Sequence, residues 1–378
     1  MPNSLPPRNI TPPKSLDAYI KEAAQQRMAF EQTRVRVGII GRSGTGKSSL
    51  INAMVGEKLA LVGVVETTME PEEFEYNGLV LVDLPGCGTP KFPAKDYASK
   101  MRLDTYDALI LVVTDRWFED DAALLDQIVS ELQVPYFIVR TKFDLAVQDG
   151  HFDHGFSEEE VRTKIEDNLR TYLGEAGLRK LYMVSSRYPA QYDLPRLLED
   201  VCGCVEGMKR ERLEAALAAW TPEGLERKLR VGRHIVHWHA MAAAANGMNP
   251  IPGLDVSVDL GILVTMIHKI KELYHIHQPP AVDVASLRNK AIAGRAAALA
   301  AKYGTPIAVE GVMRQFAKRE AGKTVAKWFP IVGQLVAGSL GYLLTYRLGI
   351  QVLEDYHNLA QQIVTDLKDA GPTPRLMS

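Results

Sequence analysis

The residues most able to do chemistry form a glycine-rich loop. Residues 41–48 read Gly-Arg-Ser-Gly-Thr-Gly-Lys-Ser and directly follow the apolar run Val35–Ile40. A strand followed by this loop and by helix-forming residues is the setting in which the GxxxxGKS pattern holds the phosphates of a nucleoside triphosphate. Backbone N–H groups in the glycine loop can turn toward phosphate oxygens, and the start of a helix favours negative charge. A turn that only joined a strand to a helix would have no need of the Lys-Ser pair.

Four side chains or N–H groups have specific expected roles around those phosphates. Lys47 should reach the β- and γ-phosphate oxygens, and the Ser48 hydroxyl should bind Mg²⁺. Asp83 and Gly86 belong to an Asp-Leu-Pro-Gly sequence that ends a second apolar strand. There the carboxylate could hold Mg²⁺ through water, and the glycine N–H could sense the γ-phosphate. The other predicted contacts of the phosphate loop are Gly41, Ser43, Gly44, Thr45, Gly46 and Ser49.

Residues 63–69, between these two motifs, read Gly-Val-Val-Glu-Thr-Thr-Met. We expect this segment to close over Mg²⁺ and the γ-phosphate, with the Thr68 hydroxyl completing the metal shell and Thr67 as the alternative ligand. Many small GTPases have a glutamine directly after the Asp-x-x-Gly glycine, which orients the attacking water. This chain has Cys87, which cannot do so. Either hydrolysis is slow, or another residue or a second chain supplies that group.

A second motif points to guanine as the base. Thr141-Lys142-Phe143-Asp144 follows the apolar run Tyr136–Val139. The Asp144 carboxylate can accept hydrogen bonds from N1–H and the 2-amino group of guanine, which adenine does not offer, and the Lys142 stem can lie on the base. The motif usually begins with asparagine, so Thr141 alters one polar contact. Ser185 and Ser186 occupy the expected base-capping turn.

The elements that must position these motifs alternate between strand and helix. The predicted strands are almost wholly apolar, and helical stretches separate them, which indicates a mostly parallel sheet covered by helices on both faces. The carboxyl ends of such strands are where ligands bind. The predicted strands are Val35–Ile40, Leu79–Val82, Ala108–Val113, Tyr136–Val139 and Leu181–Val184.

The pattern changes after about residue 200 to long segments rich in Ala, Leu, Lys and Arg. We therefore predict an α/β P-loop GTPase domain over residues 33–203 and an all-α helical domain over residues 204–370. Residues 15–32 should form a helix that packs with the helical domain, while 1–14 form a disordered leader and 371–378 a tail. The expected helices of the second domain are Glu206–Trp220, Glu223–Ala245, Val256–His275, Val284–Tyr303, Ala308–Trp328 and Val332–Leu367.

Composition limits the partners and the compartment. The 378 residues carry a formal net charge of −2, which argues against a nucleic-acid surface, and only three cysteines occur, which suggests a reducing compartment. The start of the chain has no apolar run of signal-peptide length, so a cytoplasmic protein is expected. The uncharged stretch Phe329–Tyr346 favours a buried helix over a membrane span. Three histidines, His234, His237 and His239, favour ordinary packing over a metal site.

The combined motifs of the nucleotide domain resemble those of the immunity-related GTPases, relatives of the dynamin-like large GTPases. The resemblance covers residues 33–200 and rests on the phosphate loop in its GKS form, the GVVE sequence, Asp-Leu-Pro-Gly continuing to Phe92-Pro93, Thr114-Asp115-Arg116-Trp117-Phe118, residues 139–144, and Tyr192-Asp193-Leu194-Pro195. The chain departs from the family at Val62, where relatives carry threonine, and at Ser186, where relatives often carry asparagine. The helical domain matches only loosely.

The resemblance implies GTP and GDP binding, dimers formed through the nucleotide faces, oligomers on membranes, and faster hydrolysis on assembly. It assigns a catalytic role to Glu66 and a place at the dimer face to Arg116. Expected partners are thus GTP or GDP with Mg²⁺, a second copy of the chain, and the surface of a membrane. Two alternatives remain open: a nucleotide-gated scaffold with negligible intrinsic hydrolysis, and a GTPase that inserts the stretch Phe329–Tyr346 into a membrane.

Overall fold

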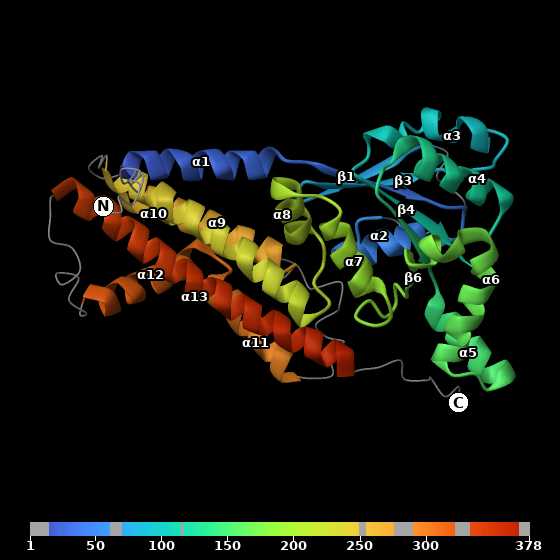
Figure 1. Cartoon of the computed structure of the whole chain (residues 1–378). Helices are drawn as coiled ribbons and strands as arrows, with labels where there is room; N and C mark the ends of the chain where they lie inside the picture. Colours follow the sequence, from blue (N-terminus) through green and yellow to red (C-terminus); the bar gives the residue numbers. More distant parts are fainter. Residues whose placement is uncertain are drawn as a thin grey trace, which may run out of the picture.

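The computed structural model describes residues 15–60, 70–114, 117–248, 255–275, 290–321 and 333–369. A sheet flanked by helices forms one half of the molecule, and long helices form the other half (Figure 1). The helix α1 (Leu16–Gln32) precedes the sheet in sequence but packs against α9 (Pro222–Met248) of the helical half. Ser15 caps α1, because its hydroxyl accepts a hydrogen bond from the Ala18 N–H at 3.3 Å.

The sheet has six strands in the order β2-β3-β1-β4-β5-β6. The five predicted strands are confirmed, and they pair in parallel. The sixth, β2, runs antiparallel to β3 at one edge and was missed, because three glutamates in its five residues hide the apolar alternation. The bounds are β1 Val35–Ile40, β2 Glu72–Tyr76, β3 Leu79–Leu84, β4 Ala108–Val113, β5 Tyr136–Arg140 and β6 Leu181–Met183.

Successive side chains of the strands enter two separate apolar cores, one on each face of the sheet. One core is closed by α2 (Lys47–Val55), α7 (Leu194–Gly203) and α8 (Gly207–Ala216), which contribute Leu50, Leu197 and Leu213. The other is closed by α3 (Ala94–Lys100), α4 (Glu119–Gln127), α5 (Phe143–His154) and α6 (Glu158–Leu178). The short η1 (Leu103–Thr105) and the π-helical η2 (Ile128–Leu132) complete this second layer. The predicted α/β fold class is confirmed.

The helical half has its own apolar core, built mainly where α9, α10 (Asp255–Leu273) and α13 (Gly333–Asp369) pack together. The helices α11 (Lys290–Tyr303) and α12 (Pro306–Ala321) lie beside α13 (Figure 1). Glycines let α9 and α13 approach closely: a Cβ on Gly349 would lie 2.7 Å from Val236 Cγ1. Pro222 and Pro306 are the first residues of α9 and α12, a position that the fixed φ of proline allows.

Two predicted elements need comment. The expected helix Glu206–Trp220 ends at Ala216, and the chain then runs on to α9 through residues 217–221. The uncharged stretch Phe329–Tyr346 begins outside the described residues, which resume with α13 at Gly333. Within the described part of the chain, no helix is both long enough and apolar enough to cross a bilayer.

Candidate functional site

The phosphate loop joins the end of β1 to the start of α2 at the carboxyl edge of the sheet. Gly46 caps α2 in the left-handed region, with φ of 89°, which side chains other than glycine rarely adopt. Gly41 lies so close to β4 that a Cβ would approach the Val112 carbonyl to 2.5 Å. Ser43 and Gly44 are exposed at the tip of the loop, and Ser48 and Ser49 lie in the first turn of α2. The Thr45 hydroxyl closes the loop by donating to the Arg42 carbonyl at 2.8 Å.

Lys47 and Asp83 meet in the interior of this loop. The Lys47 ammonium donates to the Gly41 carbonyl at 2.9 Å, and it lies 3.6 Å from Asp83 Oδ1. Burial raises the pKa of the Asp83 carboxyl, and the charge of Lys47 and a hydrogen bond from Ser48 oppose that shift. Asp83 Oδ1 is buried and accepts no hydrogen bond in the described part of the chain. A buried carboxylate oxygen that accepts no hydrogen bond, beside a serine hydroxyl, is a pair of oxygen ligands that suits Mg²⁺.

The turn after Asp83 is clamped between the phosphate loop and α3. A Cβ on Gly86 would lie 3.3 Å from the Arg42 Cα, so a side chain there would press on the phosphate loop. The fully buried Tyr97 donates its hydroxyl to the Pro85 carbonyl, a contact that the sequence motifs do not reveal. Cys87 is buried in the apolar core, since only 2% of the residue is exposed. Burial raises the pKa of its thiol to about 12.

Arg42 was not singled out from the sequence, although it occupies the second position of the phosphate loop. Its guanidinium lies 3.8 Å from the centre of the Phe118 ring and donates to Asp120 Oδ2 at 3.3 Å. Asp120 also packs against Gly88, where φ is 79° and a Cβ would collide with the carboxylate. Arg42 therefore links the phosphate loop to the start of α4 and to the turn around Cys87.

The guanine motif is tied directly to the phosphate loop. The buried Thr141 hydroxyl donates to the Thr45 carbonyl at 2.5 Å and lies 3.3 Å from the Val113 carbonyl. Lys142 donates to the Gly44 carbonyl at 2.8 Å. Thr141 thus joins the two loops through backbone carbonyls, which explains how threonine can stand where the motif usually has asparagine.

A cavity of about 370 Å³ opens between these two loops, large enough for part of a nucleotide. Asp144, in the first turn of α5, lies beside this lining but is not part of it. Ser185 is fully buried, and its hydroxyl accepts from the Arg187 and Tyr188 N–H groups at 3.2 Å, so it shapes the turn in which Ser186 lies. The cavity is lined by Ser43, Gly44, Thr114, Arg140, Lys142, Leu145, Ala146 and Asp149.

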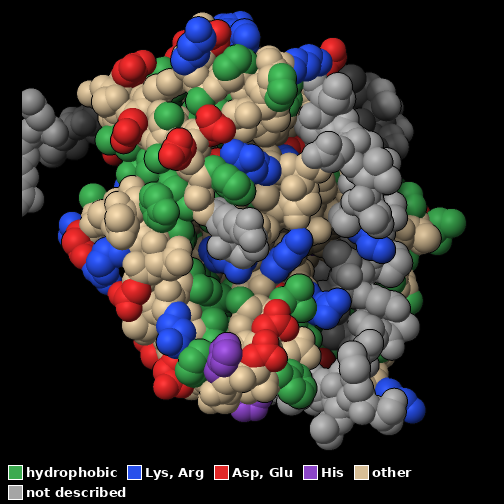
Figure 2. Space-filling model, turned by 90° about the vertical axis from the view of Figure 1, so that its right-hand side faces the viewer, with side chains coloured by type: hydrophobic (Ala, Val, Ile, Leu, Met, Phe, Trp, Pro, Cys, Tyr) green, Lys and Arg blue, Asp and Glu red, His purple; other side chains and the backbone are tan. Residues whose placement is uncertain are grey.

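Figure 2 looks at the end of the molecule formed by the nucleotide domain. Lys and Arg side chains gather near the centre of this face, beside residues drawn in grey that are not described. Two cationic side chains, Arg140 and Lys142, line the cavity. Positive charge in the lining of this cavity attracts a phosphate-bearing ligand.

Four predicted site residues, Glu66, Thr67, Thr68 and Arg116, lie outside the described residues.

The three histidines of α9 contact three different partners. His234 meets Glu211 at 2.7 Å, His237 meets the Tyr342 hydroxyl at 3.2 Å, and His239 meets the Ile235 carbonyl at 2.8 Å. Among the described residues, His, Cys, Asp and Glu nowhere form a group of three or more that could hold a metal ion. The preference for packing over metal binding is consistent with these contacts.

The family model and the similar curated proteins agree on one family. A family model described as interferon-inducible GTPase (IIGP) matches residues 15–303. Interferon-inducible GTPase 5 of Rattus norvegicus is 29% identical over 350 residues, covering 88% of this chain and 75% of the relative. Interferon-inducible GTPase 1 of Mus musculus is 29% identical over 243 residues, covering 61% of this chain and 58% of the relative. The crystal structure of the G domain of the T. maritima FeoB iron transporter is 23% identical, with a TM-score of 0.31 over 46% of this chain and 99% of that one.

Proposed function

The chain belongs to the interferon-inducible GTPase family and hydrolyses GTP, and from this premise we propose that it depends on Mg²⁺ and completes its catalytic site by self-association. The observation that carries the proposal is the burial of Cys87. Its thiol is buried in the core at the position where a water-orienting side chain would be expected. The missing group must then come from another segment or from a second chain.

We infer the roles of the chain's own residues from the geometry of the loop. Lys47 would leave its backbone partner, the Gly41 carbonyl, to contact the β- and γ-phosphate oxygens. The predicted metal ligands are Ser48, Thr68 and, through water, Asp83, and bound Mg²⁺ would neutralise charge that develops on the phosphates. The Gly86 N–H would donate to the γ-phosphate.

The base would lie between the Lys142 stem and the base-capping turn, with Asp144 accepting from guanine. Glu66 would position the attacking water in its own chain, and Arg116 would stabilise the transition state in the partner. These two roles come from the family resemblance. A role at membranes belongs to the same proposal and comes from the family resemblance.

The proposal is tested by phosphate release from GTP across a range of protein concentrations. We expect the rate per molecule to rise with concentration for the wild-type chain and to stay low for Glu66→Ala and Arg116→Ala. An equal mixture of the two variants should regain activity, because a mixed dimer contains one site with Glu66 in place and Arg116 supplied by its partner.

Arg179→Ala serves as the control, since Arg179 is exposed beyond the end of α6. It should behave like the wild type. A rate per molecule that stays flat with concentration would refute self-association and favour a nucleotide-gated scaffold. Failure of the mixture to recover would show that Glu66 and Arg116 do not act on opposite sides of one interface.

A further inference from the structure

The helix that begins at the phosphate loop ends against the helical half of the molecule. The last carbonyls of a helix lack partners within the helix and must find donors elsewhere. In α2 these donors come from residues 217–221, which connect α8 to α9. The Ala218 N–H donates to the Met54 carbonyl at 2.8 Å, and the Trp220 ring N–H donates to the Ala53 carbonyl at 3.1 Å. The linker between the two halves therefore caps the phosphate-loop helix.

A second contact starts two residues beyond α2. The Tyr76 hydroxyl donates to Glu57 Oε1 at 2.9 Å and lies 3.0 Å from His275 Nδ1. His275 Nε2 lies 3.2 Å from the Lys228 ammonium nitrogen, which also donates to the Ala215 carbonyl at 3.0 Å. The rings of Tyr76 and His275 stack with 5.3 Å between their centres. We call Glu57, Tyr76, His275 and Lys228 the joint chain.

The donors in the joint chain can all point in one direction. Because the Tyr76 hydroxyl donates its one hydrogen to Glu57, it must accept from His275, so Nδ1 of the imidazole carries the proton. Nε2 then carries no proton and can accept from Lys228. A lysine of the helical half and a carboxylate of the nucleotide domain are thus connected by a histidine and a tyrosine. Hydrogen bonds in such a series strengthen one another where water is excluded, and Lys228 is only 2% exposed.

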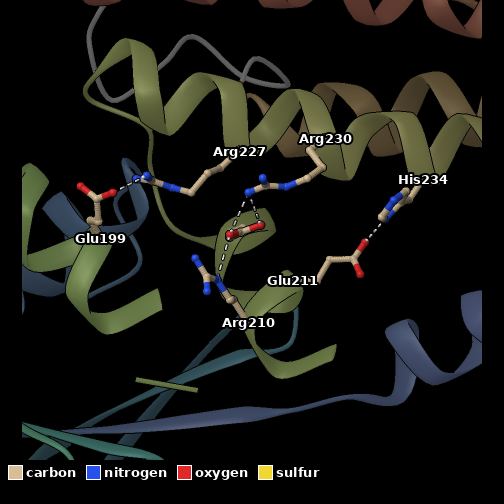
Figure 3. A network of polar contacts seen from close by, with 7 residues as sticks. Glu199, Arg210, Glu211, Arg227, Arg230 and His234 are labelled. Atoms are coloured by element: carbon tan, nitrogen blue, oxygen red, sulfur yellow. Dashed lines mark hydrogen bonds and ion pairs between the residues drawn. The ribbon is translucent and has the colours of Figure 1, made fainter. Parts of the chain in front are cut away.

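The helical side of this joint is held rigidly (Figure 3). His234 of α9 meets Glu211 of α8 at 2.7 Å, and the buried Glu214 of α8 accepts from Arg230 of α9 at 3.2 Å and from Arg210 of α8 at 3.3 Å. The Glu211 and Glu214 contacts join α8 to α9, so the Ala215 carbonyl and Lys228 belong to one packed unit. Arg227 of α9 donates to Glu199 of α7 at 3.0 Å and so connects this unit to the nucleotide domain.

The packing at the joint leaves a small space. A cavity of about 60 Å³ lies at the joint, lined in part by Gly56, Trp220, Lys228 and His275. The last turn of α2 also holds the chain that leads into residues 61–69, because Asn52 Oδ1 accepts from the Leu59 and Ala60 N–H groups at 2.8 Å. One turn of helix thus contacts the linker, adjoins the joint chain and holds the start of the segment expected to close on the γ-phosphate.

We propose that the C-terminal turn of α2 transmits the nucleotide state to the helical half, through the linker that caps it and through the joint chain. The inference rests on the proposed function, since it requires nucleotide at the phosphate loop. A shift of α2 on binding the γ-phosphate would change the contacts of Trp220 and Glu57, which lie at the far end of the helix. Replacing the Tyr76 hydroxyl interrupts the joint chain and keeps the stacked ring.

The test uses the full chain labelled with 5-fluorotryptophan, which places Trp220 among four fluorine resonances. Trp220→Phe assigns its signal. Spectra are recorded with Mg²⁺ and either GDP or a non-hydrolysable GTP analogue. We expect the Trp220 resonance to differ between the two nucleotides, and Tyr76→Phe to lose at least half of that difference. Tyr303→Phe is the matched control, because its hydroxyl donates to Asp355 at 2.8 Å within the helical half.

Titration with fluorescent GDP and GTP analogues distinguishes a failure of nucleotide binding from a failure of the coupling to the helical half. If neither nucleotide binds, the proposed function is wrong, and the coupling, which requires bound nucleotide, is wrong as well. If both bind and the Trp220 resonance is the same in each state, the coupling is wrong while the nucleotide site stands. If Tyr76→Phe and Tyr303→Phe reduced the nucleotide-dependent difference in the Trp220 resonance equally, the role of the joint chain would also be overturned.

Discussion

Replacing Lys228 with methionine should change how stability depends on pH. Lys228 is fully enclosed, and in the described part of the chain its ammonium meets the Ala215 carbonyl and His275 but no carboxylate. Burial lowers the pKa of this lysine from 10.5 to about 7. Between those two values the unfolded chain binds a proton at Lys228 that the folded chain does not bind. The free energy of unfolding of the wild type should therefore rise with pH across this window.

The expected size of the effect follows from the same linkage. One proton of difference gives a slope that approaches about 1.4 kcal/mol per pH unit. From pH 7.5 to 9.0, the wild type should gain about 2 kcal/mol relative to Lys228→Met. Loss of the donor to the Ala215 carbonyl adds a cost of about 1–3 kcal/mol to the variant, but that cost does not vary with pH. The pH dependence of the difference in unfolding free energy therefore reports the shifted pKa of Lys228, whereas its constant part does not.

Urea unfolding followed by far-ultraviolet circular dichroism measures the slope in both proteins without nucleotide. The window stops at pH 9.0 because buried thiols, whose pKa values are raised, start to act in the opposite direction as the unfolded cysteines ionise. Lys21→Met, on the exposed face of α1, is the control and should run parallel to the wild type. A wild-type minus Lys228→Met difference that stays constant across the window would refute the reasoning, and would mean that Lys228 remains charged through the joint chain.

Three further predictions concern the nucleotide domain. Thr141→Val should weaken GDP binding about fivefold, since the lost hydrogen bond to the Thr45 carbonyl is worth about 1 kcal/mol, and should leave the preference for guanine over adenine unchanged in fluorescent-nucleotide titrations. Cys87→Ala should alter GTP turnover less than twofold because its thiol is buried in the core; a tenfold loss of phosphate release would contradict that placement. Asp193→Ala should lower the free energy of unfolding in urea by about 2–3 kcal/mol, because Arg162, which donates to Asp193 at 2.7 Å, would lose its carboxylate; an unchanged midpoint would show that this pair contributes nothing.

The parts of the fold that could be predicted are those in which a local pattern has one physical solution. The run Val35–Ile40 is apolar at every position but two, and it is buried on both faces of the sheet as β1. The phosphate loop needs left-handed backbone at Gly44 and Gly46, so glycine spacing alone indicates its conformation. Ser15 marks the start of α1 through its hydroxyl. Each of these signals lies within a few residues of what it determines.

Other parts depend on contacts between residues far apart in the sequence. Tyr76 and His275 are 199 positions apart, and Tyr76 lies on the edge strand that its charged neighbours conceal. Lys228 reads in the sequence as one more cation on a helix, and only contacts with segments far along the chain bury it. Thr141 looked like a weakened base contact because the motif specifies the base, whereas its hydroxyl faces the phosphate loop. In each case the sequence gives the residue type, but the contacts of the side chain depend on the tertiary fold.

The way α2 is packed limits how it can carry a signal. Nine residues make a helix about 13 Å long, with the phosphate cradle at one end and the linker at the other. Leu50, Ile51 and Met54 are fully buried between those ends, so sliding along the axis would force several methyl groups past the sheet. A tilt about this apolar centre costs less, because the contacts there can be kept while the two ends move in opposite directions. A change of a few tenths of an ångström at Lys47 would then be matched by a change of similar size at the Ala53 and Met54 carbonyls, where the linker attaches.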